Sequence, residues 1–253
     1  MANKIWFFDR LPVDLLYDIF DYFLAHDILL SFSNVSDRVD GVLRTYSFYR
    51  FDFKSISKDN FDLICRHIKP DQVISLVLSD ASATPGQSEL FLSRISIKQF
   101  TRLQSLTLYC IENETLELIL LDLNKLDQLR SFHINSVTTK SPLRIYDYSP
   151  LINQVTPLLS KTLSQVLPKL HRLNIGQKFI ATRTPLLVNL RSLALAQSTI
   201  NELQMILIQT PHLRSLDVCL EGDTSNIELL DTPSQLKWLI LTINGNYFLT
   251  NRY

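Results

Sequence analysis

The sequence has little glycine, and this scarcity excludes several classes of enzyme. Only 5 of its 253 residues are glycine, and none stands in the G-x-G-x-x-G or G-x-x-x-x-G-K spacing that wraps backbone amides around phosphate. The nucleophile turn G-x-S-x-G is missing as well. The 5 histidines are scattered and form no H-x-x-x-H pair that would suit a metal ion. We therefore predict a chain that is not an enzyme and has no catalytic residues, no cofactor and no metal site.

The sequence also has few cysteines, no net charge and no long apolar run. The cysteines Cys65, Cys110 and Cys219 are odd in number and far apart, which is typical of a reducing compartment, so we expect the cytoplasm or nucleus. The 25 basic and 25 acidic residues cancel, so no overall charge favours nucleic acid. No stretch approaches the ~20 apolar residues that span a bilayer. We therefore expect neither nucleic acid nor membrane among the partners.

What the sequence has in abundance is a short leucine pattern. Seven pieces read L-x-x-L-x-L with apolar substitutions, namely VISLVL, LQSLTL, LRSFHI, LHRLNI, LRSLAL, LRSLDV and LKWLIL, beginning at Val73, Leu103, Leu129, Leu170, Leu190, Leu213 and Leu236. Alternate apolar residues in each piece point to one face of a strand. Most of the intervals between the pieces lie in the period of leucine-rich repeats. The chain resembles that family over about residues 55–244.

The segments between these strands carry the signals of helices. Thr199 and Glu202 have the spacing of a capping box, and Pro211 follows where that helix must end. Asn113 is expected to cap the helix that follows it. A unit of this kind cannot bury its apolar face alone, but stacked neighbours can. The resemblance implies an α/β repeat solenoid, an irregular leucine-rich repeat horseshoe of about seven repeats with a parallel sheet on its concave side.

Residues 1–50 precede this predicted repeat domain of residues 51–253 and are unusually apolar. The stretch LPVDLLYDIFDYFLAHDILLSF, residues 11–32, predicts two helices, and residues 35–46 predict a third. Pro12 suits the start of the first helix, and Asp14 favours the positive end of its dipole. Three short helices that only cap a solenoid would leave part of this surface exposed, and a large exposed apolar patch usually marks a partner site.

The pattern of this segment resembles the F-box, a small three-helix domain. The resemblance implies docking on the Skp adaptor of a cullin–RING (SCF-type) ubiquitin ligase, with the repeats binding a protein substrate. The matching residues also include Asp27, Phe32 and Val35. Those that the resemblance assigns to the adaptor contact are Leu11, Pro12, Leu15, Leu16, Ile19, Phe20, Phe23, Leu24, Ile28 and Leu29. The alternative is a ligase-independent repeat scaffold or inhibitor whose N-terminal helices merely cap the solenoid.

A candidate substrate surface lies on the concave face of the predicted sheet. Polar and aromatic residues between the apolar strand positions favour a protein partner, because nothing converges on one small-molecule pocket. The residues selected there are Tyr109, His133, Arg172, Asp217 and Trp238. The alternative is an ordinary solvated sheet face.

The 41-residue interval between Leu129 and Leu170 predicts an insertion near residues 135–165. It is either a turn-rich binding loop, which would add Arg144, Tyr146 and Tyr148 to the substrate surface, or a degenerate extra repeat near LRIY.

Two further features concern charge and the end of the chain. No acidic residue lies between Asp147 and Glu202, which predicts an electropositive strip that is either a site for an acidic partner or solvated surface. Its basic residues are Lys161, Lys169, Arg172, Lys178, Arg183 and Arg191. The final segment INGNYFLTNRY shows no clear C-terminal cap; we expect it to form a makeshift edge, or the chain to be a shortened version of a longer relative.

Overall fold

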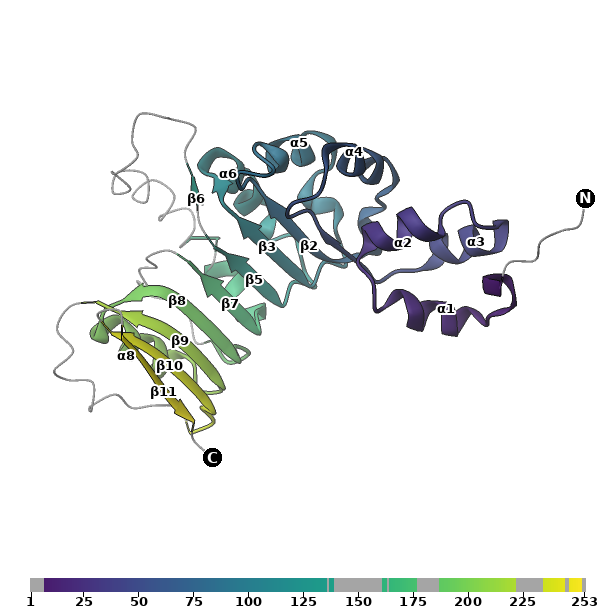
Figure 1. Ribbon diagram of the computed structural model, residues 1–253. Coiled ribbons are helices and arrows are strands. Elements are labelled where there is room, and N and C mark those ends of the chain that lie inside the picture. Colours follow the sequence, from purple (N-terminus) through teal and green to yellow (C-terminus); the bar gives the residue numbers. More distant parts are fainter. Residues whose placement is uncertain are drawn as a thin grey trace, which may run out of the picture.

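A nine-stranded, mostly parallel sheet with helices is the main feature of the computed structural model, which describes residues 7–135, 137–138, 161–162, 164–176, 187–221, 234–243 and 246–251. Figure 1 shows the strands following one another along the sheet in the order of the sequence. They are β1 (Tyr49–Asp52), β2 (Val73–Ser79), β3 (Ser105–Tyr109), β5 (Ser131–Ile134), β7 (Arg172–Ile175), β8 (Ser192–Ser198), β9 (Ser215–Leu220), β10 (Trp238–Ile243) and β11 (Asn246–Asn251). A second, two-stranded sheet pairs β4 (Ile111–Glu112) with β6 (Val137–Thr138).

The helices form two groups. The N-terminal group consists of η1 (Phe7–Arg10), α1 (Val13–Phe20), α2 (Ala25–Phe32) and α3 (Asp37–Thr45). The second group connects the strands and consists of α4 (Lys58–His67), η2 (Pro70–Gln72), α5 (Gln87–Arg94), η3 (Ile97–Gln99), α6 (Asn113–Leu123), η4 (Leu167–Lys169) and α8 (Ile200–Gln209). In Figure 1 the helices α4, α5 and α6 lie along one face of the sheet, and the N-terminal group lies at the β1 end.

Each of the seven leucine pieces contains a strand, which confirms that prediction. These strands are neighbours in sequence order, and every pair of neighbours among them is parallel. The register joins equivalent positions of the pieces into one row across the sheet: Leu76, Leu106, Phe132, Leu173, Leu193, Leu216 and Leu239. Residues at the same position of the pattern therefore lie side by side, about 4.8 Å apart.

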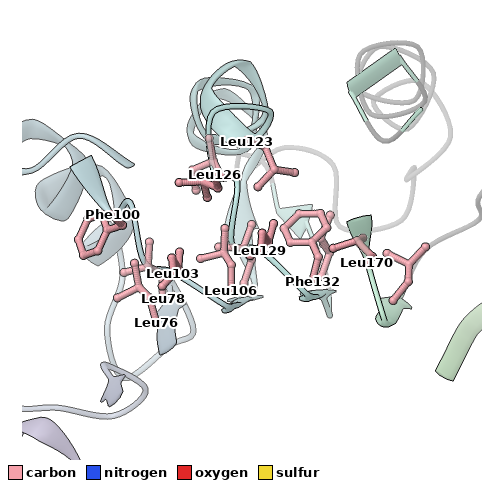
Figure 2. Close-up of a cluster of buried hydrophobic side chains, with 14 of the residues drawn as sticks. Leu76, Leu78, Phe100, Leu103, Leu106, Leu123, Leu126, Leu129, Phe132 and Leu170 are labelled. Atoms are coloured by element: carbon pink, nitrogen blue, oxygen red, sulfur yellow. The ribbon is translucent and has the colours of Figure 1, made fainter. Parts of the chain in front are cut away.

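The leucines of the pattern form the core. Both those within each strand and the one in the turn before it are buried. On β3, Leu106 and Leu108 are buried, whereas Thr107 between them is partly exposed. The leucine that opens a piece is buried as well, as Leu103 and Leu129 show. Figure 2 shows such side chains from successive strands gathered on the side of the sheet where α6 lies. The residues of β3 on the opposite face, Ser105, Thr107 and Tyr109, are partly exposed, and we call this side of the sheet the open face.

The local signals of the connecting helices are only partly reliable. The capping box before α8 is confirmed, because the Glu202 amide donates to Thr199 Oγ1 at 3.3 Å and the Thr199 amide donates to Glu202 Oε2 at 2.8 Å. The prediction that Asn113 caps a helix is wrong. Its helix α6 begins at Asn113 itself, directly after β4, and has no side-chain cap.

The leucine pattern predicts no strand before Val73, but β1 pairs in parallel with β2. Its sequence contains no leucine. Instead Tyr49, Phe51 and the following Phe53 alternate as buried aromatic residues. Because β1 spans residues 49–52, it crosses the predicted boundary between residues 50 and 51, and the N-terminal helices and the sheet share one apolar core.

At the other end of the sheet, β11 pairs with β10 in antiparallel orientation. The sheet therefore ends in a hairpin, in which the segment that we predicted to form an edge supplies the last strand. The insertion predicted near residues 135–165 lies mostly outside the described residues.

Candidate functional site

Five apolar side chains of α1 and of the turn after it are exposed. The exposed fractions are 43% for Leu15, 89% for Tyr22 and 45% for Phe23. Val13 and Leu24 are exposed at 39% and 37%. All five belong to α1 or to the turn between α1 and α2, and we call them the N-terminal apolar surface. Of the predicted adaptor contacts, Leu15, Phe23 and Leu24 lie on this surface.

The other side of α1 is part of the core, which corrects three of the predicted adaptor contacts. Leu16 and Phe20, four residues apart and thus on one side of the helix, are fully buried, and Ile28 of α2 is 1% exposed. The Phe20 ring makes edge contacts with Phe32 and Tyr46, at centroid distances of 5.1 and 5.4 Å. Leu16, Phe20 and Ile28 therefore hold the helices together rather than face a partner.

The remaining predicted contacts differ in exposure. Pro12 is exposed and directly precedes α1, while Leu11, Ile19 and Leu29 are half-buried against the core. Leu29 lies away from the N-terminal apolar surface, in the wall of a pocket of about 410 Å³. The pocket is lined by Leu29, Leu30, Ser33, Asn34, Asp40, Leu43, Arg44, Tyr49, Phe51, Leu63, Ile64, His67, Ile68, Lys69 and Gln72.

Hydrogen bonds from α3 and the segment after it fix the N-terminal apolar surface. The Tyr46 hydroxyl donates to Asp21 Oδ1 at 2.5 Å, at the start of the turn that carries Tyr22 and Phe23. Burial, together with this bond to a carboxylate, raises the pKa of Tyr46, so the phenol stays protonated. Arg38 Nη2 donates to the carbonyl oxygen of Leu11 at 2.6 Å, just before α1. The exposed apolar side chains are thus presented on a positioned backbone.

The open face of the sheet carries rows of mixed polar and apolar side chains. The central row contains Asp52, Val77, Thr107, His133, Asn174, Ala194, Asp217 and Ile240, which the strand register places next to one another. Five of the predicted substrate residues are on this face: Tyr109, His133, Arg172, Asp217 and Trp238. Trp238 is the most apolar of them and is 58% exposed.

Two of these five are in direct contact. The Tyr109 ring meets the His133 ring edge-on, with 5.5 Å between the centroids. Lys54, just after β1, places its Nζ 4.6 Å from the centre of the Tyr109 ring, which is a cation–π contact. Burial disfavours the imidazolium and lowers the pKa of His133. Sequence reasoning missed Lys54 because it assigned no strand there.

The other predicted substrate residues do not join this contact. Arg172 is paired with Ser131 and Ser192, and Asp217 with Ala194 and Ile240, each on its own strand of the sheet. The loop residues Arg144, Tyr146 and Tyr148 lie outside the described residues. The predicted substrate residues on the open face are therefore spread along the sheet and do not converge on one pocket.

Comparison with models of known protein families gave no match, and comparison with curated protein sequences gave none either. Within the ranges that the structure describes, no helix is long and apolar enough to cross a membrane. The same residues contain no group of three or more His, Cys, Asp or Glu side chains arranged to hold a metal ion.

Proposed function

We propose that the chain is the substrate-recognition subunit of an SCF-type cullin–RING ubiquitin ligase. In this proposal residues 1–50 act as an F-box that docks on the Skp adaptor, and the sheet belongs to a leucine-rich repeat solenoid that binds a protein substrate. The N-terminal apolar surface is the observation that carries the proposal. It leaves Leu15, Tyr22 and Phe23 exposed on a backbone that other contacts fix.

The repeat assignment draws its support from the sheet. Seven pieces of one pattern form seven neighbouring parallel strands, and equivalent residues fall into continuous rows. Stacked repeats produce such rows, because each unit buries its apolar face against the next. The open face of the sheet is then available for a substrate.

In this proposal the chain positions its partners and catalyses no reaction itself. One end of the chain would hold the adaptor, and through it the cullin that carries the ubiquitin-transferring subunit, while the sheet holds the substrate at a fixed distance. Holding two reactants together raises their effective concentration, which is the main service of a linked binding module.

The alternative, a repeat scaffold whose N-terminal helices only cap the sheet, draws its support from the buried side of α1. Leu16 and Phe20 do cover the end of the core. Capping, however, uses only this side of α1 and leaves Leu15 and Phe23 without a function. The two functions are therefore distinguished by substitutions on the exposed side.

The test measures binding of the purified chain to a purified Skp-type adaptor by titration calorimetry. A double substitution, Leu15→Asp with Phe23→Asp, places carboxylates in the N-terminal apolar surface. It removes ~1 kcal/mol of apolar burial per site and leaves each charge unpaired, so we expect at least about a 100-fold weaker complex. Substitution of Phe20 is unsuitable because it would disturb the core.

A matched control substitutes exposed apolar residues far from the proposed interface. Met205→Asp with Ile208→Asp changes two side chains of α8 that are 53% and 64% exposed. This variant should bind the adaptor like the unmodified chain. Equal binding by both double variants, or none by the unmodified chain, would favour the scaffold.

A further inference from the structure

A row of basic side chains runs along the edge where the strands begin. Its members, which we call the basic row, are Arg130, His171, Arg191, Arg214 and Lys237. Each directly follows the buried leucine that opens its leucine piece. The amide of each later member donates to the carbonyl oxygen of the member before it, at 2.7 to 2.8 Å. With about 4.8 Å between parallel strands, five members span roughly 19 Å.

Backbone oxygens hold two of the guanidinium groups in the basic row. Arg191 Nη1 donates to the carbonyl oxygens of Val188 and His212, at 3.5 and 3.3 Å. Arg130 Nη1 bonds two backbone carbonyls in the same way, both at 3.1 Å. A carbonyl oxygen orients a guanidinium without cancelling its charge, and the other N–H groups stay available to a ligand.

The positive charge of the basic row is not neutralised by nearby carboxylates. Among the described residues, none places a carboxylate within 4.0 Å of an Arg or Lys nitrogen of the basic row. The adjacent Asp127 is paired with Lys169 at 2.8 Å, and this ion pair lowers the pKa of the Asp127 carboxyl. Both lie with Arg130 and His171 around an open depression of about 450 Å³. Asp217 also lies on the sheet, but it is the third residue of β9 and not at the start of the strand.

Hydroxyl groups lie directly beside the basic row. The next residue on each strand, aligned by the sheet register, forms a second row of Ser105, Ser131, Arg172, Ser192, Ser215 and Trp238, which we call the serine row. Its serines are partly exposed, and no described residue forms a hydrogen bond with their hydroxyl groups. Successive residues of a strand point to opposite faces, so the two rows do not form one surface, and the basic row alone offers guanidinium and ammonium donors in a line.

We propose that the basic row binds an extended acidic peptide segment of the protein substrate. Guanidinium and ammonium donors match carboxylate groups, and a straight row of donors matches a chain that carries anions at regular spacing. The basic row contains one aromatic ring, the imidazole of His171, so stacking of successive bases, which single-stranded nucleic acid needs, has little support. This inference rests on the proposed function in taking the sheet as the substrate-binding part.

The experiment titrates the purified full chain into fluorescein-labelled peptides and follows fluorescence anisotropy. One probe is a twelve-residue peptide of alternating Glu and Ser, and a second replaces every Glu by Gln. A twelve-nucleotide oligouridylate is the third probe. We expect binding of the acidic peptide that weakens with added salt, at most weak binding of the RNA, and none of the neutral peptide.

Charge reversal in the basic row identifies the site. Arg191→Glu with Arg214→Glu should weaken acidic-peptide binding at least about tenfold, because it replaces two cations with anions facing the peptide. The control, Lys58→Glu with Arg66→Glu, reverses two exposed charges on α4 and makes the same change in net charge. It should leave peptide affinity within about twofold.

Three results would overturn the inference. The unmodified chain fails to bind the acidic peptide at low salt, the control loses as much affinity as the basic-row variant, or the RNA binds more tightly than the peptide. Circular dichroism checks that each variant is folded. Adaptor binding, measured on the same proteins, separates the two proposals: a basic-row variant that loses the peptide and keeps the adaptor leaves the proposed function intact.

Discussion

The two sides of α1 should respond very differently to truncation. Phe20 is fully buried and makes edge contacts with two other rings, whereas Leu15 on the same helix is 43% exposed. Replacing a buried Phe by Ala costs about 3–5 kcal/mol of unfolding free energy, to which each lost aromatic pair contributes ~0.5–1.5 kcal/mol. Replacing the half-exposed Leu15 by Ala should cost less than about 1 kcal/mol.

The assay is urea-induced unfolding of the full chain, followed by circular dichroism for each variant. A domain of ordinary stability unfolds with about 5–15 kcal/mol, so Phe20→Ala should shift the midpoint strongly and Leu15→Ala barely. Affinity for the adaptor should show the reverse order, with a larger loss for Leu15→Ala than for Phe20→Ala. A loss below about 1 kcal/mol for Phe20→Ala, or equal losses for the two variants, would refute the division of α1 into a core side and a partner side.

Three further predictions concern the sheet. Thr199→Ala should lower the unfolding free energy by ~1 kcal/mol because it removes the capping-box acceptor for Glu202, whereas Thr199→Ser should keep it; urea titration compares the two, and equal losses would contradict the role of the cap. Gly176→Ala should cost about 1–3 kcal/mol, seen as a lower melting temperature, because the added Cβ would lie 1.8 Å from the carbonyl oxygen of Asn135; an unchanged melting temperature would refute this. Burial lowers the pKa of His133 below its usual 6.5, so the unfolded chain takes up this proton at a higher pH than the folded chain. Stability should therefore fall as the pH drops below about 6.5, and His133→Gln should reduce this dependence in unfolding measurements at pH 7.5 and 5.5; an identical dependence in the variant would argue against it.

The leucine pattern predicted seven of the strands and their order. Each piece places apolar residues two apart, such as Leu106 and Leu108, and the repeated spacing brings equivalent positions into register. It failed for β1, where the buried residues are Tyr49 and Phe51. Their alternation with Arg50 and Asp52 is a strand signal that a search for leucine overlooks.

The candidate sites were less predictable because they depend on distant contacts. Composition indicates that α1 is apolar, but its rotation is set by the packing of Phe20 against Phe32 and Tyr46, which are 12 and 26 residues away in sequence. Only that rotation decides that Leu15 is exposed and Leu16 is buried.

The basic row on the sheet was missed for a different reason. The run without acidic residues drew attention to Lys169 and Arg191, but Lys169 is paired with Asp127. The row itself includes Arg130 and Lys237, which lie outside that run and become neighbours of the others only through the strand register. Aligning the leucine pieces reveals the row, because each member directly follows the leucine that opens its piece; a search for runs of charge along the chain overlooks it.

The central claim, that the N-terminal apolar surface docks on a Skp-type adaptor, is tested most directly by hydrogen–deuterium exchange of the chain with and without that adaptor. The account predicts slower exchange of backbone amides in residues 13–24 in the complex, with the strands from β2 onward unchanged. No complex, or protection confined to the sheet while residues 13–24 exchange as before, would contradict it.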